Sequence, residues 1–159
     1  MSEKVKIKQQ SKSYLFWKRF FDIVLSSGAL VCFSPVFLAV FIMNRFGDNK
    51  GPLFYKQERI GWHGKPFKIY KFRSMVVNAD KILEADPELY AKYVANNYKL
   101  EPEEDPRITR LGEWLRKTSI DEIPQFINIL RGEMSIIGPR PVVKKELAEY
   151  GNRVDKFLS

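Results

Sequence analysis

The residues best suited to do chemistry gather in one stretch, from Arg116 to Arg140. Two adjacent acids, Asp121 and Glu122, follow a basic pair, and the short segment GEMSIIGPRP comes after them. Carboxylates can hold a hard divalent cation or act as covalent nucleophiles at phosphorus. An arginine fork can bind two phosphate oxygens at once. This combination of acids and arginines favours chemistry on phosphoryl groups.

The same acids also have an ordinary structural interpretation. Ser119 and Glu122 have the spacing of a helix capping box, just before apolar residues at helical spacing. Pro124 fits best in the first turn of a helix, so the helix could instead start a few residues later, with Asp121 or Glu122 near its cap. In either placement the helix dipole would stabilise the two carboxylates. The pair by itself therefore does not decide between a structural and a catalytic role.

The composition limits the chemistry that is available. The chain of 159 residues is 45% hydrophobic, which suits one compact domain with a small accessory element. Its one histidine, His63, excludes a cluster of histidine metal ligands, and its one cysteine, Cys32, excludes an internal disulfide. Acid–base or metal chemistry must therefore depend on carboxylates.

The formal charge of +8 is unevenly distributed along the chain. Residues 1–75 carry a net charge of +10, and residues 76–159 carry −2. Because the basic excess surrounds an apolar segment, it favours an anionic membrane surface over a nucleic acid, for which no binding motif is present. The same charges could also serve phosphate-bearing substrates.

That apolar segment, residues 23–43, has no charge in 21 residues. A straight helix of this length would reach about 30 Å, enough to span a bilayer core. Pro35 lies near its middle and predicts a kink, because proline lacks a backbone donor and clashes with the preceding turn. Ser34 could satisfy the backbone groups that the kink frees.

The flanks of the apolar segment are both basic. Basic flanks are retained on the cytoplasmic side, so both ends would prefer the same side of the membrane. We therefore expect a re-entrant helix that breaks at Ser34 and Pro35 and returns. An ordinary spanning anchor is the alternative. A cleaved signal peptide fits less well, because residues 44–46 do not form a small-residue cleavage site.

The remainder of the chain mixes extended and helical patterns, which predicts an α+β fold. Two aromatic-rich runs within residues 52–75 flank a glycine-bounded loop at 61–64, and this pattern predicts a β-hairpin. The hairpin is basic, and its charged side chains include Lys71 and Arg73. His63 lies in its loop, where a surface role is expected.

Helical spacing extends over residues 76–100, with an interruption near Pro87. The acidic stretch 101–106 that follows is expected to be a solvated linker without a metal role. Residues 108–117 predict a basic amphipathic helix that either packs on the core or lies at the membrane surface. Its apolar side would carry Ile108, Leu111, Trp114 and Leu115.

Several blocks of the chain, in order, resemble the bacterial sugar transferases, the monotopic phosphoglycosyl transferases that act on polyprenol phosphate. The matching blocks cover about residues 18–141 and are KRFFDIVLS, the Ser34-Pro35 pair, GPLFYKQERIG, FKIYKFRSM and DPRITRLGEWLRKTSIDEIPQFINILRGEMSIIGPRP. The resemblance implies a membrane element in residues 1–46 that is re-entrant and breaks at the Ser-Pro pair. It also implies a catalytic domain in residues 47–159, at the cytoplasmic face of the bacterial inner membrane.

The resemblance further implies a reaction. A sugar 1-phosphate would pass from a nucleoside diphosphate sugar, such as a UDP sugar, to undecaprenyl phosphate, with release of the nucleoside monophosphate. This is the first membrane step in the assembly of bacterial glycans such as exopolysaccharide or capsule. In such enzymes the aspartate of the pair attacks the β-phosphate and forms a covalent phosphosugar, which places the nucleophile on Asp121. The neighbouring glutamate holds Mg²⁺, which places a metal ligand on Glu122.

The basic residues of the matching blocks also acquire implied roles. Arg116 and Arg140 correspond to phosphate ligands of the family. Lys71 and Arg73 correspond to a further basic block near the site. No residue pattern specifies the sugar or the oligomeric state.

The chain departs from the family at its end. Members usually continue with a Pro-Gly-Ile-Thr-Gly type motif, whereas this chain stops at Ser159, so we expect the catalytic domain to be truncated at its C-terminus. A second hypothesis comes from a different class of function. In it, the chain is a membrane-anchored, non-catalytic binding or scaffold protein for anionic partners.

Overall fold

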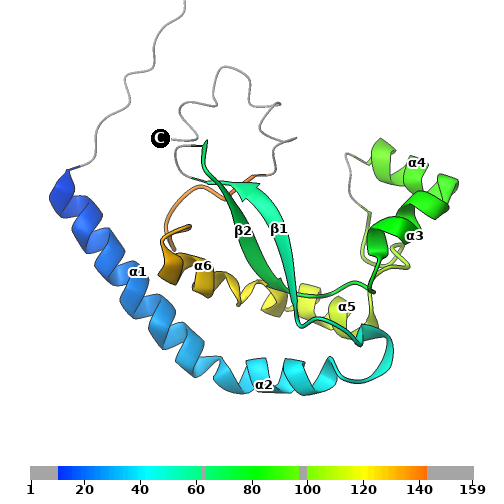
Figure 1. The fold of residues 1–159 in the computed structure, drawn as a ribbon, viewed down its shortest axis with the longest axis horizontal. Coiled ribbons are helices and arrows are strands. Elements are labelled where there is room, and N and C mark those ends of the chain that lie inside the picture. The colour runs from blue at the N-terminus through cyan, green and yellow to red at the C-terminus, as the bar shows by residue number, and fades with distance from the viewer. Residues whose placement is uncertain (1–10, 62–63, 97–99, 143–159) are drawn as a thin grey trace, which may run out of the picture. The chain divides into compact units, whose positions relative to one another are not determined.

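The computed structural model describes residues 11–61, 64–96 and 100–142 (Figure 1). These residues form six α-helices, two short 3₁₀ helices and one two-stranded sheet, so the fold is α+β as predicted. The chain divides into two compact units. The first comprises Met1–Phe33, Lys56–Tyr70 and Pro124–Ser159, and the second comprises Ser34–Tyr55 and Lys71–Ile123. These units do not follow the expected division at residue 46, which stays a prediction.

The apolar segment is broken where the sequence predicts a kink. Helix α1, Lys12–Cys32, ends before Phe33, and helix α2, Ser34–Met43, begins with the Ser-Pro pair. In the described chain, no single helix is both long enough and apolar enough to cross a membrane. The two helices meet that test only when they are taken together, and they are bent by 51° at the break.

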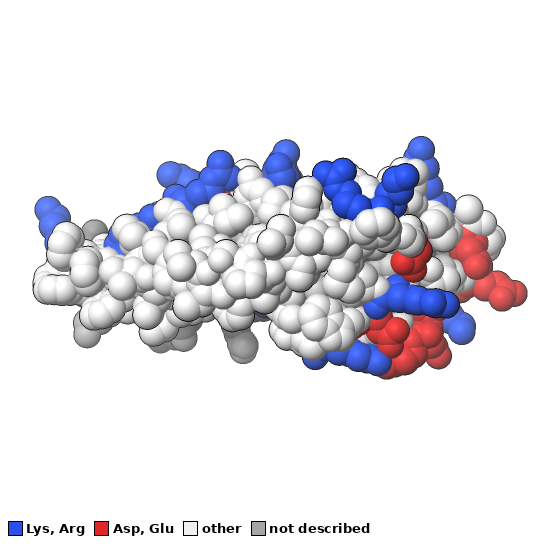
Figure 2. All heavy atoms as spheres, turned by 90° about the horizontal axis from the view of Figure 1, so that it is seen from below, with Lys and Arg blue, Asp and Glu red and all other residues white. Residues whose placement is uncertain are grey.

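Helix α1 begins well before the apolar run. Ser11 caps it by accepting a hydrogen bond from the Tyr14 amide at 3.2 Å. Its early turns are rich in aromatic residues, several of which stay exposed. Figure 2 shows the surface over α1 as a largely uncharged expanse with lysines and arginines along one edge. We call its exposed large side chains the α1 apolar face: Tyr14, Phe16, Trp17, Phe20, Phe21, Ile23, Val24, Leu25 and Val31.

In the first unit, α1 packs against helix α6, Gln125–Arg131 (Figure 1). The guanidinium of Arg19 donates hydrogen bonds to the carbonyls of Ile129 and Leu130 at the C-terminus of α6. These carbonyls lack partners within the helix, and a cation there also complements the helix dipole. Helix α6 stops at Gly132, whose φ of +78° favours glycine.

The predicted hairpin is confirmed and consists of strands β1, Phe54–Ile60, and β2, Pro66–Phe72. In the first unit, the fully buried Asn128 of α6 holds the edge of β2. Its Oδ1 accepts from the Tyr70 amide at 2.9 Å, and its Nδ2 donates to the Lys68 carbonyl at 2.8 Å. Because an amide side chain has both donors and an acceptor, it continues the backbone pairing of the strand.

The second unit contains the helices that follow the hairpin. These are α3, Ala79–Ala85, α4, Pro87–Ala95, α5, Arg110–Lys117, and the 3₁₀ helices η1, Gly47–Asn49, and η3, Ile120–Glu122. The predicted interruption near Pro87 is confirmed, because Asp86 caps a new helix there through the amides of Glu88 and Leu89. The core of this unit includes Phe72, which stacks on Phe54 at a ring distance of 5.8 Å.

Two expectations about this part of the chain need correction. The stretch 101–106 is not uniformly solvated, because Asp105 is buried and forms a two-point ion pair with Arg107, at 2.7 and 2.8 Å. Burial acts to raise the pKa of Asp105, but the hydrogen bonds and charge of Arg107 outweigh it and hold the pKa below its usual value. Trp114 does not join Leu111 and Leu115 on the buried side of α5, since it is 48% exposed.

Candidate functional site

The two adjacent acids lie in a 3₁₀ turn outside any α-helix. The amide of Glu122 donates to the Ser119 carbonyl at 3.2 Å, and the amide of Ile123 donates to the Ile120 carbonyl at 3.1 Å. Ser119 adopts a left-handed conformation with a φ of +57°, and its side chain caps no amide. The capping-box interpretation is therefore wrong. The later helix start is closer to the structure, although Pro124 occupies the cap position.

The two acids have different surroundings. Asp121 is buried, with 9% of the residue exposed, whereas Glu122 is only half-buried. Glu122 forms an ion pair with Lys71 of β2, whose ammonium lies 2.7 Å from its Oε1. The side chain of Lys71 is itself 18% exposed, so this pair sits at the edge of the unit rather than in open solvent.

Burial perturbs the titration of Asp121. Desolvation is the main cause that raises its pKa, and the charge of Glu122 acts in the same direction. Lys71 and Arg116 oppose this rise, because their positive charges favour the ionised carboxylate. Reactive sites typically contain a carboxylate of this kind, in which burial raises the pKa and nearby cations limit that rise.

Arg116 reaches this site from the last turn of α5. Its Nε donates to the hydroxyl of Ser74 at 2.9 Å, which is the only hydrogen bond of its side chain among the described residues. Burial lowers the pKa of Arg116, while the charges of Asp121 and Asp105 act to raise it. We refer to Lys71, Ser74, Arg116, Asp121 and Glu122 as the dyad cluster.

Arg73 is arranged differently from its neighbour Lys71. It is buried, and its guanidinium donates to the carbonyls of Pro52 at 2.7 Å and Met75 at 2.8 Å. It also donates to the Asn44 side chain and the Asn49 carbonyl. The predicted phosphate role of Arg73 is untested, but the geometry argues for a structural role, because these acceptors occupy each of its three nitrogens.

The buried polar network around Arg73 was not foreseen from the sequence. Asn49 donates to Asn44, and its Oδ1 accepts from the Thr109 hydroxyl at 2.8 Å. Thr109 also caps α5 by accepting from the Gly112 amide at 2.9 Å. Asparagines and threonines are common in turns, so no local signal distinguishes these buried ones from solvated ones.

The predicted site residues fall in different units. The second unit contains Asp121, Glu122, Arg116, Lys71 and Arg73, and the first four of these come together in the dyad cluster. Arg140 is exposed and belongs to the first unit, so the structure does not assign it to the cluster. Ser34 and Pro35, predicted as the membrane break, form the start of α2.

The carboxylates of the cluster can be tested for a divalent cation. In the described part of the chain, no three His, Cys, Asp or Glu side chains are grouped as a metal site. Mg²⁺ commonly takes one or two carboxylates and completes its shell with substrate phosphates and water. Glu122, the predicted metal ligand, could supply one carboxylate to such a partial site, whose remaining ligands would be phosphate oxygens and water.

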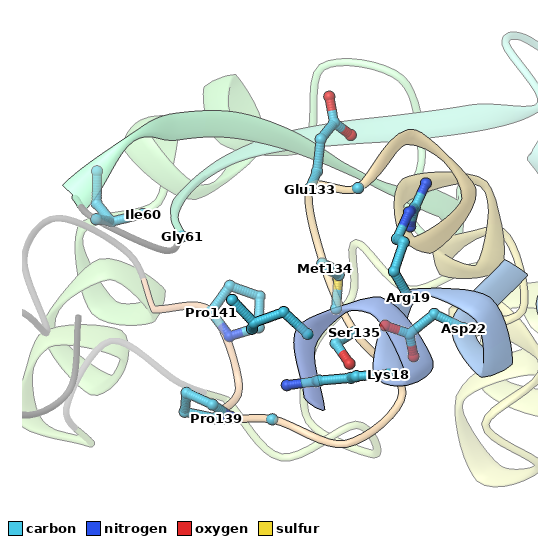
Figure 3. Close-up of a pocket in the computed structure, with 13 residues that line it drawn as sticks. Lys18, Arg19, Asp22, Ile60, Gly61, Glu133, Met134, Ser135, Pro139 and Pro141 are labelled. Atoms are coloured by element: carbon cyan, nitrogen blue, oxygen red, sulfur yellow. The ribbon is translucent and has the colours of Figure 1, made fainter. Parts of the chain in front are cut away.

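A separate cavity, of about 410 Å³, lies within the first unit. Lys18 and Asp22 of α1 line it together with the 132–141 segment, and Figure 3 shows the Lys18 ammonium directed toward its prolines. Asp22 is buried and accepts a hydrogen bond from the Ile136 amide at 3.0 Å. The Ser135 hydroxyl is buried and finds no partner among the described residues. The sequence patterns did not predict this cavity.

The chain belongs to the bacterial sugar transferase family, whose model matches residues 13–159. This confirms the resemblance carried by the sequence blocks. The chain is 47% identical over 145 residues to the exopolysaccharide production protein ExoY of Rhizobium meliloti, covering 89% of this chain and 62% of that protein. It is 44% identical over 151 residues to the undecaprenyl-phosphate galactose phosphotransferase of Salmonella typhimurium, covering 92% and 31%.

A third relative is the UDP-glucose:undecaprenyl-phosphate glucose-1-phosphate transferase of Escherichia coli. It is 39% identical over 141 residues, which are 89% of this chain and 27% of that protein. The chain thus spans less than two thirds of the length of each of these three relatives.

Proposed function

We propose that this protein transfers a sugar 1-phosphate from a nucleoside diphosphate sugar, with a UDP sugar as the expected donor, to undecaprenyl phosphate. The observation that carries this proposal is the burial of the Asp121 carboxylate, which is 9% exposed, beside the positive charges of Lys71 and Arg116, which favour its ionised form. The names of two relatives support the substrates, since they specify undecaprenyl phosphate as the carrier and, in one case, UDP-glucose as the donor. The names of others support a role in exopolysaccharide production.

In the proposed first half-reaction, a carboxylate oxygen of Asp121 attacks the β-phosphorus of the donor. An oxygen–phosphorus bond forms to Asp121, and the bond to the bridging oxygen breaks, so the nucleoside monophosphate leaves with that oxygen. In the second half-reaction, a phosphate oxygen of undecaprenyl phosphate attacks the same phosphorus and releases the carboxylate. The phosphosugar stays intact through both half-reactions, and the second one regenerates the free Asp121 carboxylate.

The remaining charges of the cluster serve this chemistry. Arg116 is proposed to bind phosphate oxygens, and Lys71 to reduce the repulsion between the carboxylates and the diphosphate. Glu122, with Asp121 beside it, would hold Mg²⁺, which when bound neutralises charge on the diphosphate and on the leaving phosphate. Arg140 stays a predicted phosphate ligand.

We further propose that the protein acts at the cytoplasmic face of the inner membrane, with α1 and α2 forming a re-entrant element. The exposed α1 apolar face and the break before Ser34 support this (Figure 2). A tag placed before Lys4 should be accessible only from the cytoplasm. Accessibility only from outside the cell would contradict the re-entrant arrangement.

The reaction itself is tested with a panel of nucleotide sugars and undecaprenyl phosphate, by measuring release of the nucleoside monophosphate. Release with one or a few sugars is expected, and it should require a divalent cation. Release that persists in full in the Asp121→Asn variant would exclude the covalent mechanism. Absence of release with every sugar would instead favour the non-catalytic binding or scaffold function.

A further inference from the structure

Ser74 follows strand β2 and is held in place through its backbone. Its carbonyl accepts a hydrogen bond from the Thr109 amide at 3.1 Å. A Cβ atom built on Gly112 of α5 would lie only 1.9 Å from the same carbonyl oxygen. Helix α5 therefore contacts residue 74 so closely that only glycine fits at the contact. Ser74 itself is 8% exposed, so its hydroxyl is attached to a well-held backbone and is largely shielded from solvent.

The hydroxyl of Ser74 accepts the Nε–H of Arg116 at 2.9 Å. A guanidinium presents its donors in a planar fork, so a bond at Nε fixes the plane and leaves the two terminal nitrogens for another acceptor. Arginine otherwise loses about 2 kcal/mol of side-chain conformational freedom when it is held by a ligand. A hydrogen bond that exists before the ligand arrives removes part of this cost.

The other buried or half-buried cations of the second unit are used differently. Arg107 forms a two-point pair with Asp105, and Lys71 is paired with Glu122. Arg73 donates to backbone carbonyls and an asparagine. Among the described residues of this unit, Arg116 is the guanidinium whose only side-chain hydrogen bond goes to a neutral hydroxyl, and its terminal nitrogens donate to no described residue.

We propose that Ser74 is a positioning residue, which holds the Arg116 guanidinium so that its terminal nitrogens bind the diphosphate of the donor. The identity of that ligand rests on the proposed function. Ser74 acts through Arg116 and does not itself touch the substrate. The family resemblance implies roles for Lys71 and Arg73 in the block FKIYKFRSM, but it implies none for Ser74 in the same block.

The first test compares Ser74→Ala with Ser74→Thr in the whole protein. Loss of a hydrogen bond to a charged group corresponds to about a tenfold effect, so Ser74→Ala should raise KM for the nucleotide sugar about tenfold. Ser74→Thr keeps the hydroxyl and should restore most of the affinity. Thr118→Val is the matched control, because its hydroxyl donates to the backbone carbonyls of Trp114 at 2.8 Å and Leu115 at 3.2 Å, at the C-terminal end of α5.

A second comparison separates positioning from a structural role. Arg116→Lys keeps a positive charge but has no Nε for Ser74 to accept from. Adding Ser74→Ala to Arg116→Lys should therefore change KM by less than about twofold, because coupled residues are not additive. Equal losses in the two backgrounds would show that Ser74 acts independently of Arg116, which would overturn the proposal.

A binding measurement distinguishes failure of this proposal from failure of the proposed function. Inorganic pyrophosphate is used as the probe, and its affinity is measured by calorimetry without turnover. Weaker binding in Ser74→Ala but not in Thr118→Val supports positioning even if no sugar is transferred. Normal transfer with unchanged KM and unchanged pyrophosphate affinity in Ser74→Ala overturns positioning and leaves the function standing. A wild-type protein that binds no pyrophosphate also overturns it, since Arg116 then has no diphosphate to hold.

Discussion

The dyad cluster of the second unit and the cavity of the first unit differ in how their charged side chains are partnered. In the cluster, Lys71 pairs with Glu122 at 2.7 Å, and the Arg116 guanidinium is held by a serine. In the cavity, Lys18 makes no hydrogen bond to a described residue and faces a volume of about 410 Å³ lined mostly by apolar groups (Figure 3). Asp121, the acid whose pKa is raised, is therefore not among the residues that line this cavity.

This difference has a physical cause. Moving a carboxylate out of water is costly unless cations or donors compensate, and the cluster provides both for Asp121. Such a group is kept where its charge is used, since well-packed apolar residues would usually be more stable. The cavity also contains a buried carboxylate, Asp22, but the hydrogen bond that it accepts comes from a backbone amide. The proposed chemistry therefore coincides with a buried, charge-compensated carboxylate and not with this cavity.

The largest effect that tests this comparison is loss of the proposed nucleophile. Asp121→Asn should reduce nucleoside monophosphate release at least about a thousandfold, because an amide cannot form the phosphosugar bond. The matched variant in the cavity is Asp22→Asn, which keeps an oxygen to accept the Ile136 amide and should lose less than about tenfold. Equal losses in these two variants would contradict the distinction between cluster and cavity.

The second effect concerns the buried ion pair between Asp105 and Arg107. Arg107→Ala leaves Asp105 buried without its partner and should lower the free energy of unfolding by about 3–5 kcal/mol, measured by denaturant titration. Replacing both residues, by Asp105→Leu with Arg107→Met, should cost clearly less. A single variant that is as stable as the double variant would show that the pair is solvated rather than buried.

The same pair predicts a pH dependence. The pKa of Asp105 lies below its usual value in the folded state, so its contribution to stability is present above the unfolded pKa of about 3.9. This contribution is lost as the pH falls through the lower folded value. In Arg107→Ala, burial without a partner should raise the pKa above the unfolded value instead. Protonation of Asp105 then favours the folded state, so unfolding curves should show that the stability lost at neutral pH is partly recovered as the pH falls, opposite to the wild-type trend.

A smaller effect tests the close contact between α5 and residue 74. Gly112→Ala should destabilise the protein by about 1–3 kcal/mol, because its Cβ would meet the Ser74 carbonyl and the backbone must shift. Gly28→Ala in α1 is the control, since a Cβ there meets nothing within 4 Å and alanine favours a helix. Thermal unfolding should therefore move in opposite directions for the two variants. A neutral Gly112→Ala would argue against the close contact.

The smallest expected effect is a shift in the pH profile. Burial raises the pKa of Asp121, so the acidic limb of kcat/KM should lie above the ordinary aspartate value. Lys71→Met removes a charge that lowers this pKa and should move the limb further up, by less than about one pH unit. Lys117→Met is the control, because Lys117 is exposed and pairs with Glu113. Its acidic limb should stay where the wild-type limb lies.

The hairpin, the helix break at Pro87 and the kink near Pro35 were predicted from the sequence because each depends on local chemistry. Proline excludes certain backbone conformations wherever it occurs, and aromatic runs bounded by glycines favour strands. The capping box at Ser119 failed for a related reason. Its spacing permits a cap, but a left-handed serine and a 3₁₀ turn satisfy the same backbone groups in another way.

The burial of Asp105 and the role of Arg73 could not be foreseen in this way. Both sit in charged stretches that are ordinarily solvated. The partners of Arg73 lie mainly in the 44–52 segment. Arg107 is close to Asp105 in the chain, so for this pair it is the burial that depends on the tertiary fold. Ser74 belongs with them. Its hydroxyl gains significance only because Gly112 lets α5 approach the backbone of residue 74.

The amino-acid sequence alone determined the family, the adjacent acids Asp121 and Glu122 and the broken apolar segment, because residue identity and spacing carry these features directly. Only the tertiary structure decided which acid is buried, which cation pairs with Glu122 and which arginine keeps its terminal nitrogens available. Burial and pairing depend on residues far apart in the chain, here strand β2 against the turn at η3. Desolvation then gives two neighbouring carboxylates of the same chemistry different surroundings, and burial raises the pKa of Asp121.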